Sequence, residues 1–420
     1  MPPYSKSLDV YINDNLIGVA HQDDAGRFEF AYHSNYDSTP LSLSMPVTNE
    51  PYRNKVVRPY LMGLLPDNRS QREALANQHD ISANNPIALL NYIGLDCPGA
   101  VQFMPSTEAN RLEQKPGRYT ALSEGEIKAE LERIIKNGQA SWQLPKEHWS
   151  LGGTQSKIAL ARFDGQWFRC EGAAATTHII KPGIAQLQHE ALNECICQNI
   201  AAASGLLAAK ASFEVFDGIP ALVSERFDRD IVGLKRVRRL HQEDFCQALS
   251  IDPENKYASE GGPTPSSILH LLNKHANPLE NKIQFTMQLF FNYLIGAPDA
   301  HGKNYSVLLE GKDVRLAPLY DCASALAYDG EQVDYRSAMT IGGERDFFQL
   351  KKRDIIKYAE QAQLSDETCF HLMSELAENI LKTQDDIFAQ FDEFEGTKEL
   401  SDRMKPKISN NCKSIIRNLK

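Results

Sequence analysis

Between Ser150 and Asp321 the sequence alternates short hairpin patterns with helical patterns, and this order restricts the fold more than any other feature. Three segments predict hairpins, because two strand-like runs flank a tight turn: KIALARF-DGQ-WFRC, ASFEVF-DGI-PALVSERF and YSVLLE-GKD-VRLAPLYD. Apolar residues at helical spacing separate them, in LQHEALNECICQNIAAASG and KIQFTMQLFFNYLIG. A polar loop with two glycines, SLGGTQSK, precedes the first hairpin. The order predicts an α+β fold whose C-terminal part is mainly helical.

The first hundred residues predict a separate β-rich region. LDVYIND, NLIGVAHQ and RFEFAYH alternate apolar and polar residues, which is typical of an antiparallel meander. Helical spacing follows in PYLMGLLPDNRSQREALANQ, and PIALLNYIGLDCPGAVQFMP predicts helix, turn and strand. A further amphipathic helix begins after Ser123, where Glu126 completes a capping box. With 420 residues the chain is too long for one core, so we expect several subdomains.

Composition and charge narrow the class of protein. The formal net charge is −10, so any contact with DNA would need a local basic patch or a partner protein. The eight cysteines are scattered and match neither a zinc pattern nor a disulfide framework, which favours a reducing cytosol. The N-terminus lacks a signal pattern, and no apolar run reaches the ~18 residues of a membrane span. We therefore expect a cytoplasmic protein that does not enter the membrane.

The loop GAPDAHGKN sets reactive side chains directly after an apolar helical pattern. Asp299 and Asn304 are five residues apart, and Asp321 follows the next hairpin. Protein kinases place a base Asp and a metal-binding Asn at this spacing, with a second metal-binding Asp after a short hairpin. Asp and Asn oxygens suit Mg²⁺, and Lys303 would neutralise charge on a transferring phosphate. The pattern predicts a phosphoryl-transfer site.

Residues upstream of this loop fit the part of a kinase that binds the nucleotide phosphates. Lys181 ends the strand pattern THIIK, and the next helix carries Glu190 and Glu194. A kinase holds its phosphate-binding lysine with a helix glutamate, and we expect Glu194, which is deeper in the helix, to take that role. Gly152 and Gly153 let backbone N–H groups approach phosphates.

The segment SERFD lies where the connection between two kinase lobes is expected, so backbone groups of Glu225 and Phe227 would face adenine. Each of these features alone is common in proteins without kinase activity. Loops are rich in Asp and Asn, and an Asp at a strand end is usually a turn former. The prediction depends on the ordered series of glycine loop, lysine strand, glutamate helix, linking hairpin, Asp–Asn loop, hairpin and Asp.

These segments also resemble a known family. SLGGTQSK, THIIKP, ERFDRD, RLHQEDFCQAL, GAPDAHGKNYSV and PLYD, in that order, resemble the HipA serine/threonine kinases, which are bacterial toxins of toxin–antitoxin pairs. PLSLSMP, LLPDN and IGLDCPGAVQFMP resemble the N-terminal domain of the same family, so the resemblance covers roughly residues 8–385. It implies a two-lobed kinase-like fold. We place a β-rich subdomain at 1–107, a connection with a helix at 108–149, the core of the small lobe at 150–230 and a helical large lobe at 231–420.

The resemblance implies a role for each matching residue. Asp299 would be the catalytic base, Asn304 and Asp321 would hold Mg²⁺, Glu194 would support the phosphate-binding lysine, and Ser150 would be autophosphorylated. The residues implied in ATP binding are Gly152, Gly153, Thr154, Gln155, Ser156, Lys157, Lys181, Glu225, Arg226, Phe227, His301, Gly302, Lys303, Asn304, Tyr320 and Asp321. Pro298 and Ala300 differ from some members, which leaves fine substrate positioning open.

Partners also follow from the resemblance. Family members pair with a small helix-turn-helix antitoxin, similar to HipB, that dimerises on operator DNA, and the kinase acts as corepressor. Their protein targets include aminoacyl-tRNA synthetases, glutamyl-tRNA synthetase among them. Two alternatives stay open: a small-molecule kinase of the same fold, and a non-catalytic corepressor. The basic cluster Lys235, Arg236, Arg238 and Arg239 is interpreted as a solvated loop. For the basic tail from Ser401, an ordinary solvated surface is the main interpretation, and contact with an acidic partner or DNA backbone is the alternative.

Overall fold

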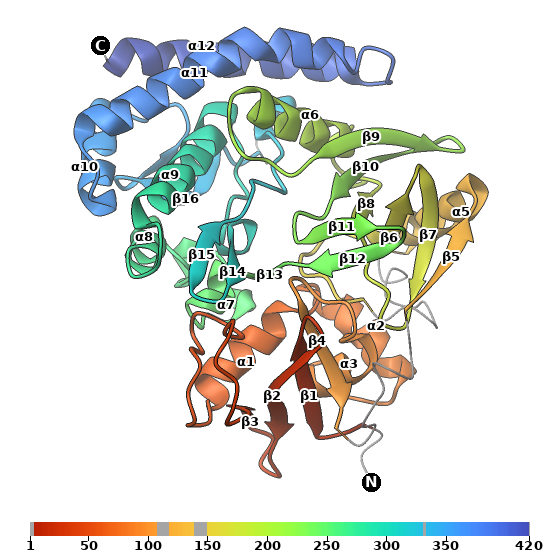
Figure 1. Ribbon diagram of the computed structural model, residues 1–420. Coiled ribbons are helices and arrows are strands. Elements are labelled where there is room, and N and C mark those ends of the chain that lie inside the picture. The colour runs from red at the N-terminus through yellow and green to blue at the C-terminus, as the bar shows by residue number, and fades with distance from the viewer. Residues whose placement is uncertain (1–3, 107–116, 138–148, 331–332, 420) are drawn as a thin grey trace. The chain divides into compact units, whose positions relative to one another are not determined.

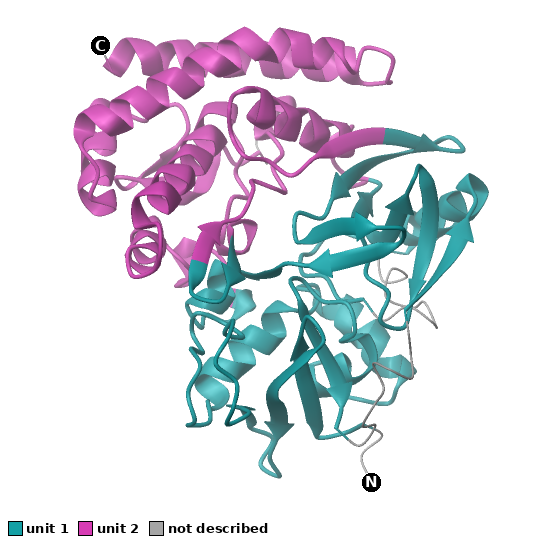
Figure 2. Cartoon of the chain, viewed as in Figure 1, with its two compact units in different colours: residues 1–182, 214–254, 307–313 teal, residues 183–213, 255–306, 314–420 magenta. Residues whose placement is uncertain are grey.

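The computed structural model describes residues 4–106, 117–137, 149–330 and 333–419 of the chain. It divides into two compact units (Figure 2), of which unit 1 comprises residues 1–182, 214–254 and 307–313 and unit 2 comprises residues 183–213, 255–306 and 314–420. Each unit therefore gathers segments that are distant in the sequence. Sheets and helices are both present throughout, which confirms the predicted α+β class. The four predicted segments are a finer division that the two units do not test, and they stay a prediction.

The N-terminal part of unit 1 is a four-stranded sheet with helices packed on it (Figure 1). The strand order is β3-β2-β1-β4, and β1 pairs antiparallel with both β2 and β4, so the predicted meander is confirmed. Buried side chains of both sheet and helices form one core, which also includes Trp149, Leu151 and Ala159. The elements are β1 (Ser7–Ile12), β2 (Asn15–Gln22), β3 (Phe28–Tyr32), α1 (Asn54–Gly63), α2 (Arg69–Gln78), α3 (Pro86–Ile93) and β4 (Val101–Pro105).

A second sheet in unit 1 carries the predicted lysine strand. Its order is β5-β7-β6-β8-β10-β9, and α5 packs on it through Ile127, Leu131 and Ile134. The capping box of α5 at Ser123 and Glu126 is confirmed. The hairpin β6–β7 is also confirmed, and β8 lies between β6 and β10. The elements are β5 (Arg118–Leu122), α5 (Glu124–Lys136), β6 (Ile158–Phe163), β7 (Gln166–Glu171), β8 (His178–Lys181), β9 (Ala211–Phe216) and β10 (Ile219–Glu225).

The segment after β10 differs from the prediction of helix. It forms a further hairpin of β11 (Arg229–Gly233) and β12 (Arg236–Arg239), then β13 (His241–Asp244) and one helical turn, α7 (Phe245–Ala248). Within the basic cluster, Lys235, Arg236 and Arg238 are exposed as expected. The prediction is wrong for Arg239, because its guanidinium bonds the buried carboxylate of Asp96 at 3.1 Å. That partner is more than a hundred residues away in the sequence, so no local pattern indicates it.

Unit 2 is mainly helical. In it α11 packs against α6, α9, α10 and α12 (Figure 1), and β16 pairs with β17. The hairpin of β14 and β15 is confirmed, and β14 begins in unit 2 and continues into unit 1. The elements are α6 (Glu190–Ala203), α8 (Pro265–Leu272), α9 (Pro278–Ile295), β14 (Ser306–Glu310), β15 (Asp313–Leu316), β16 (Arg336–Ile341), β17 (Glu344–Asp346), α10 (Lys352–Ala362), α11 (Asp366–Ala389) and α12 (Thr397–Leu419).

Two further predictions of continuous helix need correction. The segment PYLMGLLPDNRSQREALANQ contains two helices, because the chain leaves α1 before Pro66 and starts α2 after Asn68, whose side chain accepts a hydrogen bond from Ser70 N. The region after Asp321 contains the strands β16 and β17 before its helices. All eight cysteines are free and buried. Within the described residues, no helix has both the length and the apolar character that crossing a membrane requires.

Candidate active site

The loop with Asp299 begins where α9 is forced to stop. Gly296 follows the helix with φ 69°, a backbone conformation that favours glycine, and caps it through a bond from its N–H to Tyr293 O. The Asn411 side chain of α12 donates to the carbonyls of Tyr293 and Leu294, at 2.9 and 3.1 Å. The orphan carbonyls at the end of α9 are thus satisfied from a second helix. The start of the loop is therefore held rigidly on the core of unit 2.

Asp299 presents its carboxylate outward while its backbone is tied down. The side chain is 64% exposed, and Oδ1 accepts a hydrogen bond of 2.6 Å from the Tyr257 hydroxyl. The Asp299 carbonyl accepts bonds of 2.8 Å from both His301 N and the Asn304 amide Nδ2. The bond from Asn304 closes the loop over the five-residue interval that the spacing singled out. A fixed carboxylate that is open to solvent is suited to accept a proton from an incoming hydroxyl.

A tyrosine next to Asp321, the second predicted carboxylate, is bonded to this loop. The Tyr320 hydroxyl donates to Lys303 O at 2.6 Å and also contacts Ser306 Oγ at 2.6 Å. Asp321 is the next residue, is exposed and has φ 55°, a left-handed conformation that Asp tolerates. The segment after β15 that carries Asp321 is therefore fixed against the segment that carries Lys303 and Asn304. The structure brings these two motifs together.

Helix α6 is connected to the segment that follows Asp321. Asn193 donates from Nδ2 to Ser324 O at 2.8 Å, and its Oδ1 accepts from Ser324 N at 3.1 Å. Ser324 Oγ in turn donates to Ile295 O at the end of α9. Glu194 follows Asn193 in α6 and is 2% exposed. Its helix is thus fixed in unit 2, whereas Lys181 belongs to unit 1, so the pair of Lys181 and Glu194 stays a prediction.

The glycine loop is anchored in unit 1 at its first residue and at Gly153. Ser150 is fully buried, with N donating to Asp96 O at 2.9 Å and Oγ donating to Leu64 O at 2.5 Å. Gly153 O accepts from Asp67 N at 3.2 Å. Gly153 has φ 97°, and a Cβ there would lie 2.7 Å from the Nζ of Lys157. The backbone conformation at 153 therefore favours glycine, and a larger residue would also displace the end of the Lys157 side chain.

Lys157 and Lys181 are buried lysines among the residues predicted to bind ATP. Lys157 Nζ bonds Gly152 O at 2.6 Å across the loop, and Lys181 ends β8 opposite Leu222 of β10. The remaining loop residues that are predicted to bind ATP, Thr154 to Ser156, are exposed or half-buried.

The segment SERFD, predicted to connect the two kinase lobes, is called the hinge below. In it Glu225 is exposed, Phe227 is half-buried and Arg226 is buried. The backbone N–H of Arg226 donates to Thr177 O at 2.9 Å, which ties the hinge to the start of β8. The Arg226 guanidinium points into a buried ion cluster, where it bonds Asp228 Oδ2 at 2.8 Å. The roles in ATP binding that the sequence assigns to these residues stay predictions.

The residues predicted to hold the metal fit Mg²⁺ in their donor chemistry. Asn304 uses its amide nitrogen for the bond to Asp299 O, which leaves the amide oxygen as a ligand. Asp321 adds a carboxylate, and both are oxygen donors, as Mg²⁺ prefers. The described residues contain no cluster of three or more His, Cys, Asp or Glu side chains of the kind that holds a metal alone. Mg²⁺ bound with few protein ligands and several phosphate oxygens matches this sparse donor set.

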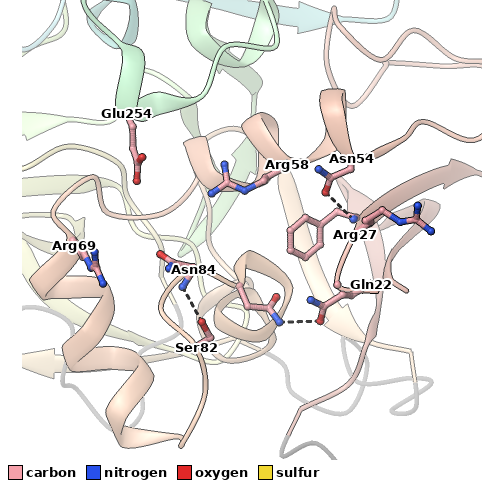
Figure 3. A pocket seen from close by; sticks show the side chains of 11 residues that line it. Gln22, Arg27, Asn54, Arg58, Arg69, Ser82, Asn84 and Glu254 are labelled. Carbon is pink, nitrogen blue, oxygen red and sulfur yellow. Dashed lines mark hydrogen bonds between the residues drawn. The ribbon is translucent and has the colours of Figure 1, made fainter. Parts of the chain in front are cut away.

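A polar hollow of about 620 Å³ lies elsewhere in unit 1, and none of the predicted site residues lines it. Gln22, Asn54 and Asn84 project toward it among three arginines (Figure 3). Each of these arginines has its own carboxylate partner: Arg27 pairs with Asp23, Arg58 with Asp252 and Arg69 with Glu73. The hollow therefore has no excess positive charge from these arginines to attract an anion.

Comparisons with known proteins agree with this geometry. The fold and the Asp–Asn loop define a kinase-like α+β protein. Residues 149–384 match the HipA-like C-terminal domain, and residues 8–104 match the HipA N-terminal domain. The chain belongs to the HipA family.

Relatives of the chain span most of its length. It is 39% identical over 351 residues to the "Putative kinase Y4mE" of Sinorhizobium fredii, and the match covers 80% of each chain. It is 30% identical over 363 residues to the serine/threonine-protein kinase toxin HipA of Shewanella oneidensis, 81% of this chain and 79% of that one. The solved complex of Shewanella oneidensis HipA, HipB and operator DNA contains a chain with a TM-score of 0.86, 26% identity and 98% coverage of both chains. The resemblance predicted from the motifs is confirmed.

The sequence alone did not indicate two further residues that position the candidate site. Tyr257 contacts Asp299 from a segment more than forty residues upstream, and Asn193 connects α6 to the segment after Asp321. Tyr257 lies in the polar stretch KYASEGG, which resembles an ordinary loop. Asn193 lies between Leu192 and Glu194 on helix α6, most of which is buried, and a buried amide needs a partner. A polar residue on a helix that is predicted to be buried indicates that a hydrogen-bond partner exists, but it does not indicate which residue that partner is.

Proposed function

We propose that this protein is an ATP-dependent serine/threonine protein kinase and the toxin of a toxin–antitoxin pair. The observation that carries the proposal is the hydrogen bond of 2.6 Å from Tyr320 to Lys303 O, because it supports placing Asp321 beside the loop of Asp299 and Asn304. Kinase chemistry needs these groups together. The similarity to a kinase toxin over 79% of that protein supports the same class.

In this proposal each polar group has a separate task. Asp299 accepts the proton of the target hydroxyl, and Tyr257 fixes the carboxylate for that step. Lys303 faces the charge that develops on the transferred phosphoryl group. Asn304 and Asp321 would hold Mg²⁺, which neutralises phosphate charge when it is bound.

Further residues are proposed to bind the nucleotide. Gly152 to Lys157 would contact phosphates through backbone N–H groups and the Lys157 amine, and Lys181 would bind phosphate with Glu194 as its support. Backbone groups of Glu225 to Phe227 would meet the adenine ring. His301, Gly302 and Tyr320 complete the proposed set around the transfer loop. Ser150 is the proposed site of autophosphorylation.

Partners are proposed on the basis of the relative whose solved complex contains HipB and operator DNA. We propose that a HipB-like helix-turn-helix antitoxin binds this chain and that the pair acts as a repressor on operator DNA, which the antitoxin contacts. The proposed cellular target is a protein, with aminoacyl-tRNA synthetases as the class to test first.

Transfer from labelled ATP tests the proposal directly. The purified chain is incubated with Mg²⁺ and γ-labelled ATP, with and without glutamyl-tRNA synthetase as probe, and phosphosites are located by mass spectrometry. We expect label on Ser150 of the chain, and a serine or threonine of the probe if it is a target. Asp299→Asn should lower transfer by at least about 10²-fold while Mg-ATP still binds in calorimetry.

Matched outcomes separate the alternatives. Asp366→Asn replaces an aspartate in the first turn of α11 and serves as the control with unchanged transfer. If Mg-ATP binds but no protein residue is labelled, the protein-kinase assignment is wrong and a small-molecule kinase is favoured. If Mg-ATP does not bind at all, the chain is a non-catalytic family member.

A further inference from the structure

One carboxylate from the N-terminal domain lies at the centre of a buried ion cluster. Asp96, in the segment between α3 and β4, has a side chain only 2% exposed. Its Oδ1 accepts from Arg229 at 2.9 Å and from Arg239 at 3.1 Å. Its Oδ2 accepts from Thr176 N at 3.0 Å and Thr176 Oγ1 at 2.8 Å, and lies 3.4 Å from Arg226 Nη1.

One of these partners lies in a segment proposed to bind the nucleotide, and another lies next to such a segment. Thr176 lies two residues before β8, the strand that ends on Lys181, and Arg226 lies in the proposed hinge. Thr176 Oγ1 also accepts a bond of 2.8 Å from Arg226, so the two segments are joined to each other at Asp96.

The backbone of Asp96 reaches a third segment of the same kind. Ser150 N donates to Asp96 O at 2.9 Å, and Asp96 forms a parallel β-bridge with Trp149. Trp149 and Leu151 pack in the core of the N-terminal sheet. The start of the glycine loop is therefore fixed by the N-terminal domain, through both hydrogen bonds and apolar packing.

Charge explains why an aspartate is needed here. Two carboxylates, Asp96 and Asp228, lie among the three guanidinium groups of Arg226, Arg229 and Arg239. Burial by itself would raise the pKa of Asp96, but the three arginines outweigh it and hold the pKa well below its usual range. A carboxylate offers about four acceptor sites, whereas an asparagine offers one oxygen and two donors that point at cations.

We propose that Asp96 is a positioning residue for ATP binding. Asp96 holds the glycine loop, the strand of Lys181 and the hinge at a fixed spacing from one another. The inference rests on the proposed function, because it concerns the same nucleotide. It assigns to the N-terminal domain a direct part in nucleotide binding: a residue outside the kinase-like domain holds three of its nucleotide-binding segments. Residues 8–104 match the N-terminal family domain, whereas Ser150, Thr176 and Arg226 lie within 149–384.

The test compares Asp96→Asn with wild type by titration calorimetry with Mg-ATP and by the kinetics of autophosphorylation. We expect the Kd and KM for ATP to rise at least about tenfold, because one hydrogen-bonded charge is worth about one to two tenfold steps. The kcat at saturating ATP should change less than about threefold. Hydrogen exchange should increase in peptides that cover residues 150–157 and 222–227.

A second variant and a control keep the outcome decisive. Thr176→Val keeps the shape of the side chain and removes the hydroxyl that links Asp96 to Arg226, and it should raise KM about threefold to tenfold. Glu243→Gln alters another fully buried carboxylate of unit 1, which contacts Ser42 and Leu43 and none of the nucleotide-binding segments. It should leave KM unchanged.

The kinetic pattern separates positioning from loss of folded protein. Partial unfolding lowers the active fraction and hence kcat, with KM unchanged, and that pattern in both Asp96→Asn and Thr176→Val would overturn the inference. If Asp96→Asn does not fold, Thr176→Val decides, and an unchanged KM in it also overturns the inference. Wild-type chain that does not bind Mg-ATP would instead refute the proposed function itself, and the inference with it.

Discussion

The hydroxyl of Tyr257 donates a hydrogen bond of 2.6 Å to Oδ1 of Asp299, and its ring meets the His301 ring edge to face at 5.0 Å between centroids. Asp299 therefore has one oxygen held by a fixed donor and one oxygen left for a substrate hydroxyl. The His301 ring, which is buried, sets the direction of the tyrosine. The bond fixes the rotamer of a side chain that is otherwise exposed, and a fixed base contributes more to transfer than a mobile one.

Removal of this hydroxyl should impair turnover more than nucleotide binding. Tyr257→Phe keeps the ring contact with His301 but frees the Asp299 carboxylate. We expect kcat for autophosphorylation to fall about tenfold, the equivalent of one hydrogen bond, with the KM for ATP unchanged. Tyr335→Phe, which removes a hydroxyl bound to Tyr328 O in the same unit, is the control. Equal kcat in wild type and Tyr257→Phe would show that the bond has no part in transfer.

Metal binding should depend more strongly on Asp321 than on Asn304. Asp321→Ala removes a full charge and Asn304→Ala removes a neutral oxygen, so the first should weaken Mg-ATP binding more. Asn304→Ala also removes the bond of 2.8 Å to Asp299 O and should lower kcat as well. Calorimetry with and without Mg²⁺ measures the difference. Variants that keep the full magnesium dependence of wild type would mean that the ion has other ligands.

Phosphorylation of Ser150 should release the glycine loop. The hydroxyl is fully buried and bonds Leu64 O at 2.5 Å, so a phosphate of nearly two negative charges cannot stay in that place. We expect phosphorylated protein to bind Mg-ATP at least about tenfold more weakly and to exchange amide hydrogen faster in residues 149–157.

Ser150→Ala and phosphatase-treated protein are the controls for this switch. The alanine variant should stay unmodified and lose about 1 kcal/mol of stability, because Leu64 O loses its donor. Phosphatase treatment should restore ATP binding in the phosphorylated protein. The switch is refuted if fully phosphorylated chain binds ATP as tightly as the treated chain.

Stability should fall as the pH rises from 6.5 to 8, through Glu243. Burial raises the pKa of this carboxyl to about 8, from 4.5 in an open environment, and its bonds to Leu43 N and Ser42 Oγ only partly oppose this. In the window between these values the folded chain holds a proton that the unfolded chain has released. Unfolding therefore releases a proton, and the free energy of unfolding falls by up to about 1.4 kcal/mol for each pH unit of increase.

Glu243→Gln should flatten this slope, which urea unfolding at pH 6.5 and 8 measures. The difference from wild type should be about 2 kcal/mol over the interval. His178 and His241 act in the opposite direction, because burial lowers the pKa of each to about 4 and their unfolded forms lose their last protons just above pH 6.5. Wild type and variant share this contribution, so it cancels in the difference between them. Most of the histidine contribution lies at lower pH, where the free energy of unfolding rises with pH between about 4 and 6.5. Parallel slopes in wild type and variant would mean that Glu243 is ionised in the fold.

The sequence by itself determined the local elements and the chemistry that they carry. The meander, the hairpins and the capped helix at Ser123 follow from apolar spacing, turn residues and caps, all of which act over a few residues. The interval from Asp299 to Asn304 follows from the same short range, and the structure closes it with one hydrogen bond. Family membership follows from the order of such motifs along the chain.

Only the tertiary structure decided which distant residues meet. Asp96 lies 130 positions from Arg226 and Tyr257 lies 42 positions from Asp299, and neither pair has a pattern within a helix or strand period. The same reason explains the errors at Arg239, at β13 and at β16, where burial against distant segments overrides local preference. Local propensity is set by neighbours in the sequence, whereas the partners of buried charges are the residues that the folded core brings near. A buried charge without a partner destabilises the fold by more free energy than any local preference provides.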